Sequence, residues 1–278
     1  MASFRRVALI GKQNSREVDA TLKEIREFVA GRGCEVQKDG KGADLAIVVG
    51  GDGTMLTAAR ELVPLGVPLV GINQGRLGFM TDIGHDDMRD GLGAILGGRY
   101  VIEERSLLDA EIVRNGKSML RTVALNEAVV GKGAQGRLIE FELSLDGEFV
   151  YSLRADGILV ATPTGSTAYA LSAQGPILHP AVPALALVPL NPHTLSARPV
   201  SVSDKSVIAI KLARTPGLDA QCYFDGFALA ELAPGDGLIL KRSSHVARFV
   251  HPPGYKYFAT LREKLGWSET RHKERGSS

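Results

Sequence analysis

The chain has 278 residues, of which 44% are hydrophobic, enough to fill the core of one large domain or two ordinary ones. Its 33 basic and 31 acidic residues leave a formal charge of only +2, which gives no sign of a nucleic-acid or membrane partner. Cys34 and Cys222 are far apart without a neighbouring thiol, which disfavours a disulfide framework and a CxxC metal site. No signal-length apolar run precedes the first strand-like segment, so we expect a cytoplasmic protein.

Short apolar runs alternate with helical patterns over the first hundred residues. The expected strands are Val7–Ile10, Leu45–Val49 and Pro68–Ile72, and the expected helices are Arg16–Gly31 and a second beginning at Thr54. This order is typical of βαβ units on a parallel sheet. We therefore expect residues 1–99 to form an α/β domain with a Rossmann-like parallel sheet.

The first expected helix has one apolar face. Val18, Leu22, Ile25 and Val29 are spaced by four, three and four residues, so they fall on the same side of a helix. That face is predicted to cover the sheet.

After Arg99 the pattern changes to alternating segments of strand length. One such segment precedes Asn115-Gly116 and another precedes Asp146-Gly147, dipeptides that favour the positive φ angles of a tight hairpin turn. We therefore expect residues 100–254 to form a β-rich, sandwich-like domain. Tyr255–Trp267 is a predicted helix, within a C-terminal segment 255–278 that we expect to complete the first domain.

The run Gly50-Gly51-Asp52-Gly53-Thr54 follows the expected strand Leu45–Val49 directly. Ligands bind at such strand ends, and glycines let a backbone approach a polyphosphate beside the start of a helix. Asp52 would repel phosphate unless it handled a proton or a metal, so the run indicates a catalytic site. The alternative is a plain turn with Thr54 as the N-cap of the helix.

The sequence lacks the motifs of several common enzyme classes and metal sites. The sequence has neither the GxxxxGK(S/T) run of a P-loop nor the spaced lysine of protein kinases, which disfavours both. No GxSxG elbow surrounds Ser166 or Ser172, so a hydrolase is disfavoured too. The six histidines show no HExxH or similar spacing, which disfavours a protein-held zinc.

Together with three further segments, the glycine-rich run closely resembles the NAD kinase family. The segments are Gly71–Asp82, Ala124–Ala128 and Asp156–Tyr169, which look like the family's signatures in its order and at its spacings. Diacylglycerol-type lipid kinases share the run, and phosphofructokinases have a related form, so the resemblance implies that kind of fold for the N-terminal domain. The likeness extends from about Val7 to Trp267.

The end of the chain is most similar to the proteobacterial branch of that family, through Pro192–Pro199 and Lys264–Trp267. The resemblance implies an ATP-dependent NAD kinase, which transfers the γ-phosphoryl group of ATP to the 2′-hydroxyl of the adenosine ribose of NAD. NADP and ADP would be the products. Mg²⁺ or another divalent cation would arrive with the ATP phosphates, and we assign it no protein ligand. ATP and oxidised NAD are the hypothesised preferred substrates.

The resemblance assigns roles to residues of this chain. Asp52 is the implied general base; a carboxylate is a weak base toward an alcohol, so most of the acceleration should come from positioning and charge neutralisation. The residues implied to bind the ATP phosphates are Gly50, Gly51, Gly53 and Thr54. Those implied to bind NAD are Asp52, Gly53, Asn126, Glu127, Arg137, Arg154, Asp156, Thr167, Ala168, Tyr169 and Ser172.

By the same resemblance, Asp156 reaches a nicotinamide-side site of a neighbouring subunit. The active site would then require a homodimer or a homotetramer with sites shared between subunits. Without the family, Asn126-Glu127 is a strand-end turn, Thr162–Thr167 is a capped loop, and Arg137 and Arg154 are solvated surface charges.

Phe227 departs from the family pattern, which often has glutamine or another polar residue after Phe224-Asp225-Gly226. A hydrogen bond from that side chain is absent, and the phenyl ring stacks on a ligand ring or simply packs.

Two competing functions are a lipid or sugar kinase that does not depend on NAD, and a non-catalytic module that senses NAD or NADP. The Asn126-Glu127 and Asp156–Tyr169 segments disfavour the first, and an intact Asp52 loop disfavours the second.

Overall fold

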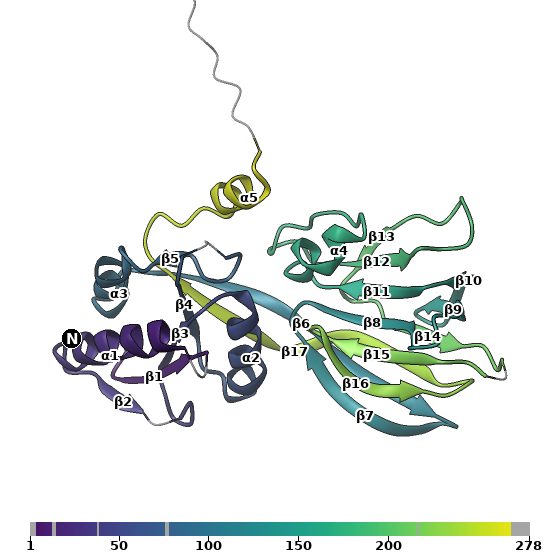
Figure 1. Ribbon diagram of the computed structural model, residues 1–278, viewed down its shortest axis with the longest axis horizontal. Helices are drawn as coiled ribbons and strands as arrows, with labels where there is room; N and C mark the ends of the chain where they lie inside the picture. The colour runs from purple at the N-terminus through teal and green to yellow at the C-terminus, as the bar shows by residue number, and fades with distance from the viewer. Residues whose placement is uncertain (1–3, 13–14, 38, 76–77, 216, 268–278) are drawn as a thin grey trace, which may run out of the picture. The chain divides into compact units, whose positions relative to one another are not determined.

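The computed structural model describes residues 4–12, 15–37, 39–75, 78–215 and 217–267. These residues form two compact units, which are seen in Figure 1. Unit 1 contains the described residues of Met1–Ala58, Leu69–Ile102 and Val250–Ser278, and unit 2 contains those of Ala59–Pro68 and Glu103–Phe249. Residues 268–278, at the end of the predicted segment 255–278, lie outside the described residues.

Unit 1 contains a parallel sheet. Its strands lie in the order β2 (Glu35–Gln37), β1 (Arg6–Gly11), β3 (Leu45–Val49), β4 (Leu69–Asn73) and β5 (Ile83–Gly84). The three strands predicted from the apolar runs are confirmed. Every residue of β3 and β4 is buried, as expected for parallel strands covered on both faces. The short, polar β2 has no apolar run, so the sequence did not predict it.

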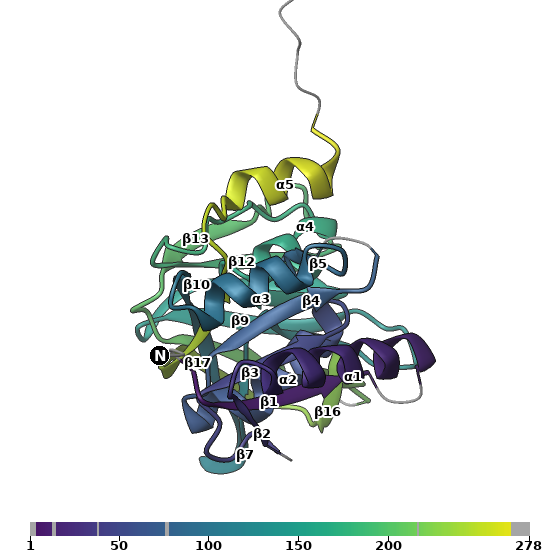
Figure 2. The same cartoon turned by 90° about the vertical axis from the view of Figure 1, so that its left-hand side faces the viewer.

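Helices cover both faces of this sheet. α1 (Arg16–Ala30) and α3 (Met88–Leu96) lie over one face and α2 (Asp52–Leu62) over the other, as Figures 1 and 2 show. The predicted apolar face of α1 is confirmed, since Val18, Ile25 and Val29 are buried. The core beneath α1 and α3 is built from Val7, Val18, Ile25, Val29, Leu45, Ile47, Val49, Val70, Ile72, Met88, Leu92 and Ile95.

Two helix boundaries differ from expectation. α2 begins at Asp52, not at Thr54, and the Thr54 N–H donates to the Gly51 carbonyl at 3.0 Å, so Thr54 lies within the first turn and is not an N-cap. The helix predicted within Tyr255–Trp267 is α5 (Tyr257–Leu265), which belongs to unit 1. Among the described helices, none is long and apolar enough to cross a membrane.

Unit 2 is rich in β-structure, as predicted. One set of strands runs in the order β10 (Glu148–Ala155), β9 (Ile139–Leu145), β14 (Ile208–Leu212) and β17 (Gly237–His251). A six-stranded sheet has the order β13 (Val200–Ser203), β12 (Ala184–Leu190), β11 (Gly157–Ala161), β8 (Glu127–Lys132), β15 (Ala220–Phe224) and β16 (Phe227–Leu232). A hairpin joins β6 (Val101–Arg114) to β7 (Lys117–Ala124).

A single core joins the two sheets of unit 2. Side chains from both contribute to it, including Ala128 of β8, Phe141 of β9, Ile158 of β11 and Ile208 of β14. Because the strands are antiparallel, alternate side chains of β9 face this core and solvent. Strand β8, which begins at Glu127 directly after Asn126, pairs with β11 on one side and with β15 on the other.

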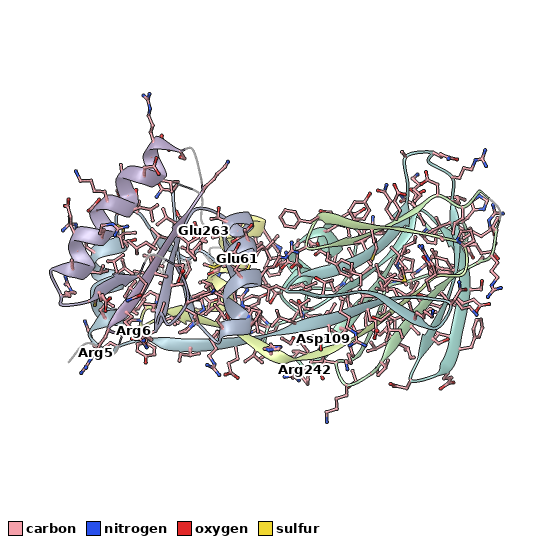
Figure 3. The ribbon with its side chains drawn as sticks, turned by 90° about the horizontal axis from the view of Figure 1, so that it is seen from below. Arg5, Arg6, Glu61, Asp109, Arg242 and Glu263 are labelled. Carbon is pink, nitrogen blue, oxygen red and sulfur yellow. The ribbon has the colours of Figure 1, made fainter. Side chains whose placement is uncertain are left out.

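Ion pairs add to the apolar core in each unit. Arg6 of β1, labelled in Figure 3, pairs with Asp44 at 2.7 Å, and the Asp44 carboxylate also accepts the backbone N–H groups of Arg5 and Arg6. Arg242 of β17, labelled in the same figure, pairs with the buried Asp204 at 2.5 Å. The first contact connects the starts of β1 and β3, and the second connects β17 to the β13–β14 turn.

The two predicted hairpin turns are confirmed. Asn115 and Gly116 have φ angles of 50° and 75°, and Asp146 and Gly147 have φ angles of 52° and 85°. A third turn of this kind, Asp225-Gly226 with φ angles of 52° and 81°, joins β15 to β16. These positive angles explain the Asn-Gly and Asp-Gly pairs, since other L-residues are strained there.

We expect Gly116→Ala to lower the free energy of unfolding by about 1–2 kcal/mol, because a Cβ is strained at positive φ. Gly237→Ala is the matched control: it adds the same methyl group where φ is not positive and the nearest atoms are at ordinary contact distance, 3.7 Å and 4.0 Å. Urea unfolding of both variants measures the difference. Equal losses of stability would contradict the strain argument.

Candidate functional site

The glycine-rich loop connects β3 to α2 at the carboxyl edge of the parallel sheet. Gly50 has φ +151°, and a Cβ there would lie 2.5 Å from Thr54 Oγ1, so only glycine fits. Its N–H donates to the carbonyl of Ile72 in β4 at 2.9 Å. Gly51 and Gly53 are exposed with open space where a Cβ would be. The loop therefore leaves the first N–H groups of α2 accessible to an anionic ligand.

Asp52 is held by backbone donors from a distant part of unit 1. Its Oδ1 accepts the N–H of Met80 at 2.9 Å and its Oδ2 accepts the N–H of Phe79 at 3.0 Å. A Cβ at Gly78 would collide with the same carboxylate, so the loop 78–80 approaches as closely as a glycine permits. A carboxylate oxygen can accept more than one hydrogen bond, so the half-buried Asp52 can still accept a hydrogen bond from a ligand.

A positive charge lies beside this loop. The ammonium group of Lys264 in α5 is 5.6 Å from the centroid of the Phe79 ring. This arrangement places an exposed cation next to the residues that hold Asp52. Neither Lys264 nor the two N–H donors was predicted as a site residue, because their approach depends on the fold.

A second polar site lies at the start of β8 in unit 2, where Asp225 organises the backbone. Its buried carboxylate accepts the N–H groups of Asn126 at 2.7 Å, Leu125 at 3.0 Å and Glu127 at 3.3 Å. The Asp225 N–H in turn donates to the Glu127 carbonyl at 3.0 Å. The β15–β16 turn thus fixes the direction in which the Asn126 and Glu127 side chains leave the strand.

Asn126 and Glu127 retain unused polar atoms. Their side chains are 6% and 5% exposed, and Asn126 Oδ1 and Glu127 Oε2 are buried without a hydrogen-bond partner among the described residues. Leaving such atoms unpaired costs about 1–3 kcal/mol each, so their retention indicates a ligand. Burial, reinforced by the charge of Asp225, raises the pKa of Glu127 from its ordinary 4.5 to about 7. Glu127 can therefore donate or accept a hydrogen bond near neutral pH.

The turn after β11 packs directly on this pair. Thr162 donates its hydroxyl to the Leu125 carbonyl at 2.5 Å and its N–H to the Asn126 carbonyl at 2.9 Å. A Cβ at Gly165 would overlap the Asn126 backbone. The Ser166 hydroxyl bonds Pro163 and Leu178 within the turn. Ser166 therefore shapes the turn, and its hydroxyl is not free to attack a substrate.

The predicted NAD contacts after this turn lie on a short helical segment. Thr167 ends a 3₁₀ turn and donates its hydroxyl to the Thr164 carbonyl at 3.1 Å, and Ala168 precedes α4 (Tyr169–Ser172). Tyr169 and Ser172 line a pocket of about 600 Å³ together with Asn191 and Arg198. The helix that follows this turn is thus only one turn long.

Asp156 contacts the edge of that pocket. Its carboxylate forms an ion pair with Lys132 at 2.6 Å and accepts the Asn191 amide at 2.9 Å. Both contacts lower the pKa of Asp156 below its ordinary range. The side chain is therefore an ionised carboxylate, tied to the pocket through Asn191.

Arg137 and Arg154 come together in a different pocket. This cavity of about 340 Å³ is also lined by Glu140 and Asp219. The two arginines line this one cavity, while Tyr169 and Ser172 line the other pocket. The predicted NAD residues of unit 2 thus divide into three places: the start of β8, the α4 pocket and the arginine pocket.

Phe227 is about half exposed at the turn that carries Asp225, with the guanidinium group of Arg60 at 5.1 Å from the centre of its ring. The ring therefore forms a cation–π contact with Arg60. The most informative residue that sequence reasoning missed is Asp225 itself. The Asp225-Gly226 pair predicts an ordinary hairpin turn. The sequence does not indicate that the Asp225 carboxylate is buried and accepts N–H groups of residues 125–127.

Across the described part of the chain, no group of three or more His, Cys, Asp or Glu side chains could hold a metal ion. Beside Asp52, the N–H groups of Phe79 and Met80 are used by its carboxylate, and the nearby Lys264 ammonium is a cation that suits an anionic ligand.

Two sequence models of known domains match the chain. The model of the ATP-NAD kinase N-terminal domain matches residues 32–100, and that of the ATP-NAD kinase C-terminal domain matches residues 125–252. A curated NAD kinase from Aromatoleum aromaticum is 54% identical, over 96% of this chain and 96% of its own. An NAD kinase from an Azoarcus species is 50% identical, over 96% of this chain and 97% of its own.

Two solved structures share the fold. Yeast NADH kinase complexed with NADH superposes with a TM-score of 0.85 at 22% identity, covering 99% of this chain and 90% of the yeast chain. An NAD kinase from Archaeoglobus fulgidus in complex with ATP superposes with a TM-score of 0.74 at 27% identity, covering 94% of this chain and 97% of its own.

The buried Glu127 predicts a pH-dependent stability. Between the ordinary pKa of 4.5 and the raised value of about 7, folded Glu127 keeps a proton that the unfolded chain releases, so stability falls as pH rises through that window. Relative to Glu127→Gln, the wild type should lose about 2–3 kcal/mol from pH 4.5 to pH 7.5, one pKa unit corresponding to about 1.4 kcal/mol.

Urea unfolding without ligand, at several pH values, measures this difference. Glu148→Gln provides the control, since it makes the same change at an exposed position of β10. A constant offset between wild type and Glu127→Gln over the whole range would contradict the raised pKa.

Proposed function

The chain belongs to the NAD kinase family, and from this premise we propose that the Asp52 loop carries out the chemistry and that the Asn126–Glu127 pair binds NAD. The reaction transfers the γ-phosphoryl group of ATP to the 2′-hydroxyl of the adenosine ribose of NAD, which gives NADP and ADP. The observation that carries the assignment of Asp52 is its pair of backbone hydrogen bonds, which fix the carboxylate while leaving capacity for a substrate hydroxyl.

Asp52 is the proposed general base. Its carboxylate accepts the proton of the ribose 2′-hydroxyl as the oxygen attacks the γ-phosphorus, and the bond from that phosphorus to the β,γ-bridging oxygen breaks. Proton removal is late, because in a loose transition state the bond to phosphorus is barely formed, so little positive charge develops on the attacking hydroxyl oxygen to acidify its proton. The main contribution of Asp52 is then to hold the hydroxyl in line with the phosphorus, which the rigid carboxylate suits.

The donor phosphates are proposed to lie against Gly50, Gly51, Gly53 and Thr54. Support comes from the open space above Gly51 and Gly53 and from the position of the loop at the N-terminal end of α2, which favours an anion. Mg²⁺ is proposed as part of the nucleotide substrate, neutralising its phosphates, since the described residues form no metal-binding cluster. ATP and oxidised NAD are the proposed preferred substrates.

Asn126 and Glu127 are proposed to bind the adenosine part of NAD. An amide oxygen and a carboxyl group of raised pKa match the amino and hydroxyl groups of adenine and ribose. Thr167, Ala168, Tyr169 and Ser172 are proposed to bind further along the dinucleotide, at the pocket beside α4. Arg137 and Arg154 are proposed to face substrate from the arginine pocket.

We also propose a cytoplasmic homodimer or homotetramer in which Asp156 serves the NAD site of a neighbouring subunit. Its carboxylate is ionised and partly exposed, and its contacts to Lys132 and Asn191 give it a fixed orientation. A carboxylate in such a position can bind an amide or hydroxyl group of a ligand.

Asp52→Asn should lower kcat for NADP formation by about 100-fold or more, with a change of less than about 3-fold in the KM for NAD, because the base is lost while the binding contacts stay. Asp90→Asn is the matched control: Asp90 is also an aspartate in the first turn of a helix, α3, but is exposed. Rates are measured with ATP, Mg²⁺ and NAD, with folding checked by circular dichroism.

A folded Asp52→Asn enzyme with the kcat of wild type would refute the base assignment. A wild-type protein that binds NAD yet forms no NADP would instead favour the sensing function.

Shared sites predict complementation between two inactive variants. Asp52→Asn and Asp156→Ala should each be weakly active alone, and mixed oligomers should regain activity, since one kind of site then combines an intact Asp52 with an intact Asp156. Subunits are exchanged in mild denaturant, and activity and mass are followed by a coupled assay and light scattering. Mixed oligomers without any recovery would contradict sharing through Asp156.

A further inference from the structure

Asn73 bridges both ends of the loop that holds Asp52. It is the last residue of β4 and is 6% exposed. Its Oδ1 accepts the N–H of Gly75 at 3.2 Å, just beyond the strand, and its Nδ2 donates to the carbonyl of Thr81 at 3.2 Å, just before β5. One amide group thus uses its acceptor on the outgoing chain and its donor on the returning chain. Residues 76–77 of the loop lie outside the described part.

The carbonyl that Asn73 binds is the one that shapes the N–H donors of Asp52. Thr81 O also accepts the N–H of Gly78 at 3.1 Å, which closes residues 78–81 into a compact turn. Within that turn, the N–H groups of Phe79 and Met80 point to the two oxygens of Asp52. A shift of the Thr81 carbonyl therefore moves both donors together.

The surrounding backbone leaves the loop little other freedom. β4 and β5 pair in parallel with Asn73 opposite Gly84, so the two ends of the loop are fixed at its base. A Cβ at Gly71 would lie 2.5 Å from the Met80 carbonyl oxygen, which shows how closely the returning chain packs on β4. Beyond that base, the amide of Asn73 is bonded to both sides of the loop.

We propose that Asn73 is a positioning residue for phosphoryl transfer, acting through the Phe79 and Met80 N–H groups on the Asp52 carboxylate. The inference rests on the role proposed above for Asp52. Asparagine suits the task because it combines a donor and an acceptor in one short, neutral, planar group that can be buried. Aspartate would lose the bond to the Thr81 carbonyl, and an aliphatic residue would lose both bonds.

The first test is kinetic. Asn73→Ala should lower kcat about 10- to 100-fold, since a displacement near 1 Å at a reacting group costs about that much, with less than about a 3-fold change in the KM for NAD. In the Asp52→Asn background the same change should cost almost nothing more, because the group that Asn73 positions is already gone. Losses that multiply in the double variant, or a rise in KM equal to the fall in kcat, would overturn the proposal.

A second test is independent of activity. Residue-resolved hydrogen exchange should show the amides of Phe79 and Met80 exchanging about 10-fold faster in Asn73→Ala, while amides of β3 keep their wild-type rates, because only the loop opens more readily. Asn73→Ser should give an intermediate effect in both tests, since a hydroxyl can bind the nearby Gly75 N–H but is too short to span the loop.

Cys34→Ala is the matched control. It also removes a buried side chain of unit 1 that donates to a backbone carbonyl, that of Phe4 at 3.4 Å, and it should change neither kcat nor exchange at Phe79 and Met80. Unchanged exchange in Asn73→Ala would overturn the positioning role. Faster exchange together with an Asp52→Asn enzyme of wild-type kcat would instead refute the catalytic role of Asp52 and leave the anchoring by Asn73 standing.

Discussion

Two backbone N–H groups on one carboxylate are the interaction on which the Asp52 site depends. The N–H groups of Phe79 and Met80 each bind one oxygen of Asp52, at the point where β3 turns into α2. Without them, an aspartate at the start of a helix could rotate freely in a glycine-rich loop. With them, the carboxylate has one direction, and the turn 78–81 becomes part of the site.

In unit 2, a carboxylate also accepts backbone N–H groups, but these bonds orient the neighbouring backbone. Asp225 is buried and accepts three N–H groups from residues 125–127, so its bonding capacity is largely used within the protein. The polar atoms that stay unpaired belong instead to Asn126 and Glu127. The Asp52 carboxylate is thus fixed but can still accept a bond from a ligand, whereas the Asp225 carboxylate orients the neighbouring backbone. The raised pKa of Glu127 is a consequence of that burial beside Asp225.

Much of the fold could be predicted from the sequence because its signals are local. Apolar runs mark β1, β3 and β4, the spacing of Val18, Ile25 and Val29 marks the buried face of α1, and Asn115-Gly116 and Asp146-Gly147 mark their hairpins. The short β2 and the start of α2 at Asp52 escaped prediction. A three-residue polar strand has no period to detect, and the glycines before α2 hide where helical hydrogen bonding begins.

The sequence by itself determined the chemistry of this protein: an acid inside a glycine-rich loop, the paired Asn126 and Glu127, and the signatures that relate the chain to NAD kinases. Only the tertiary structure decided how those groups are held. Phe79 and Met80 act through backbone N–H groups, which every residue other than proline has, and they reach Asp52 across 27 and 28 positions of chain. Asp225 reaches Asn126 across 99. Such bonds cannot be predicted from the identity of the donor's side chain, because they depend on where the fold places the backbone N–H groups.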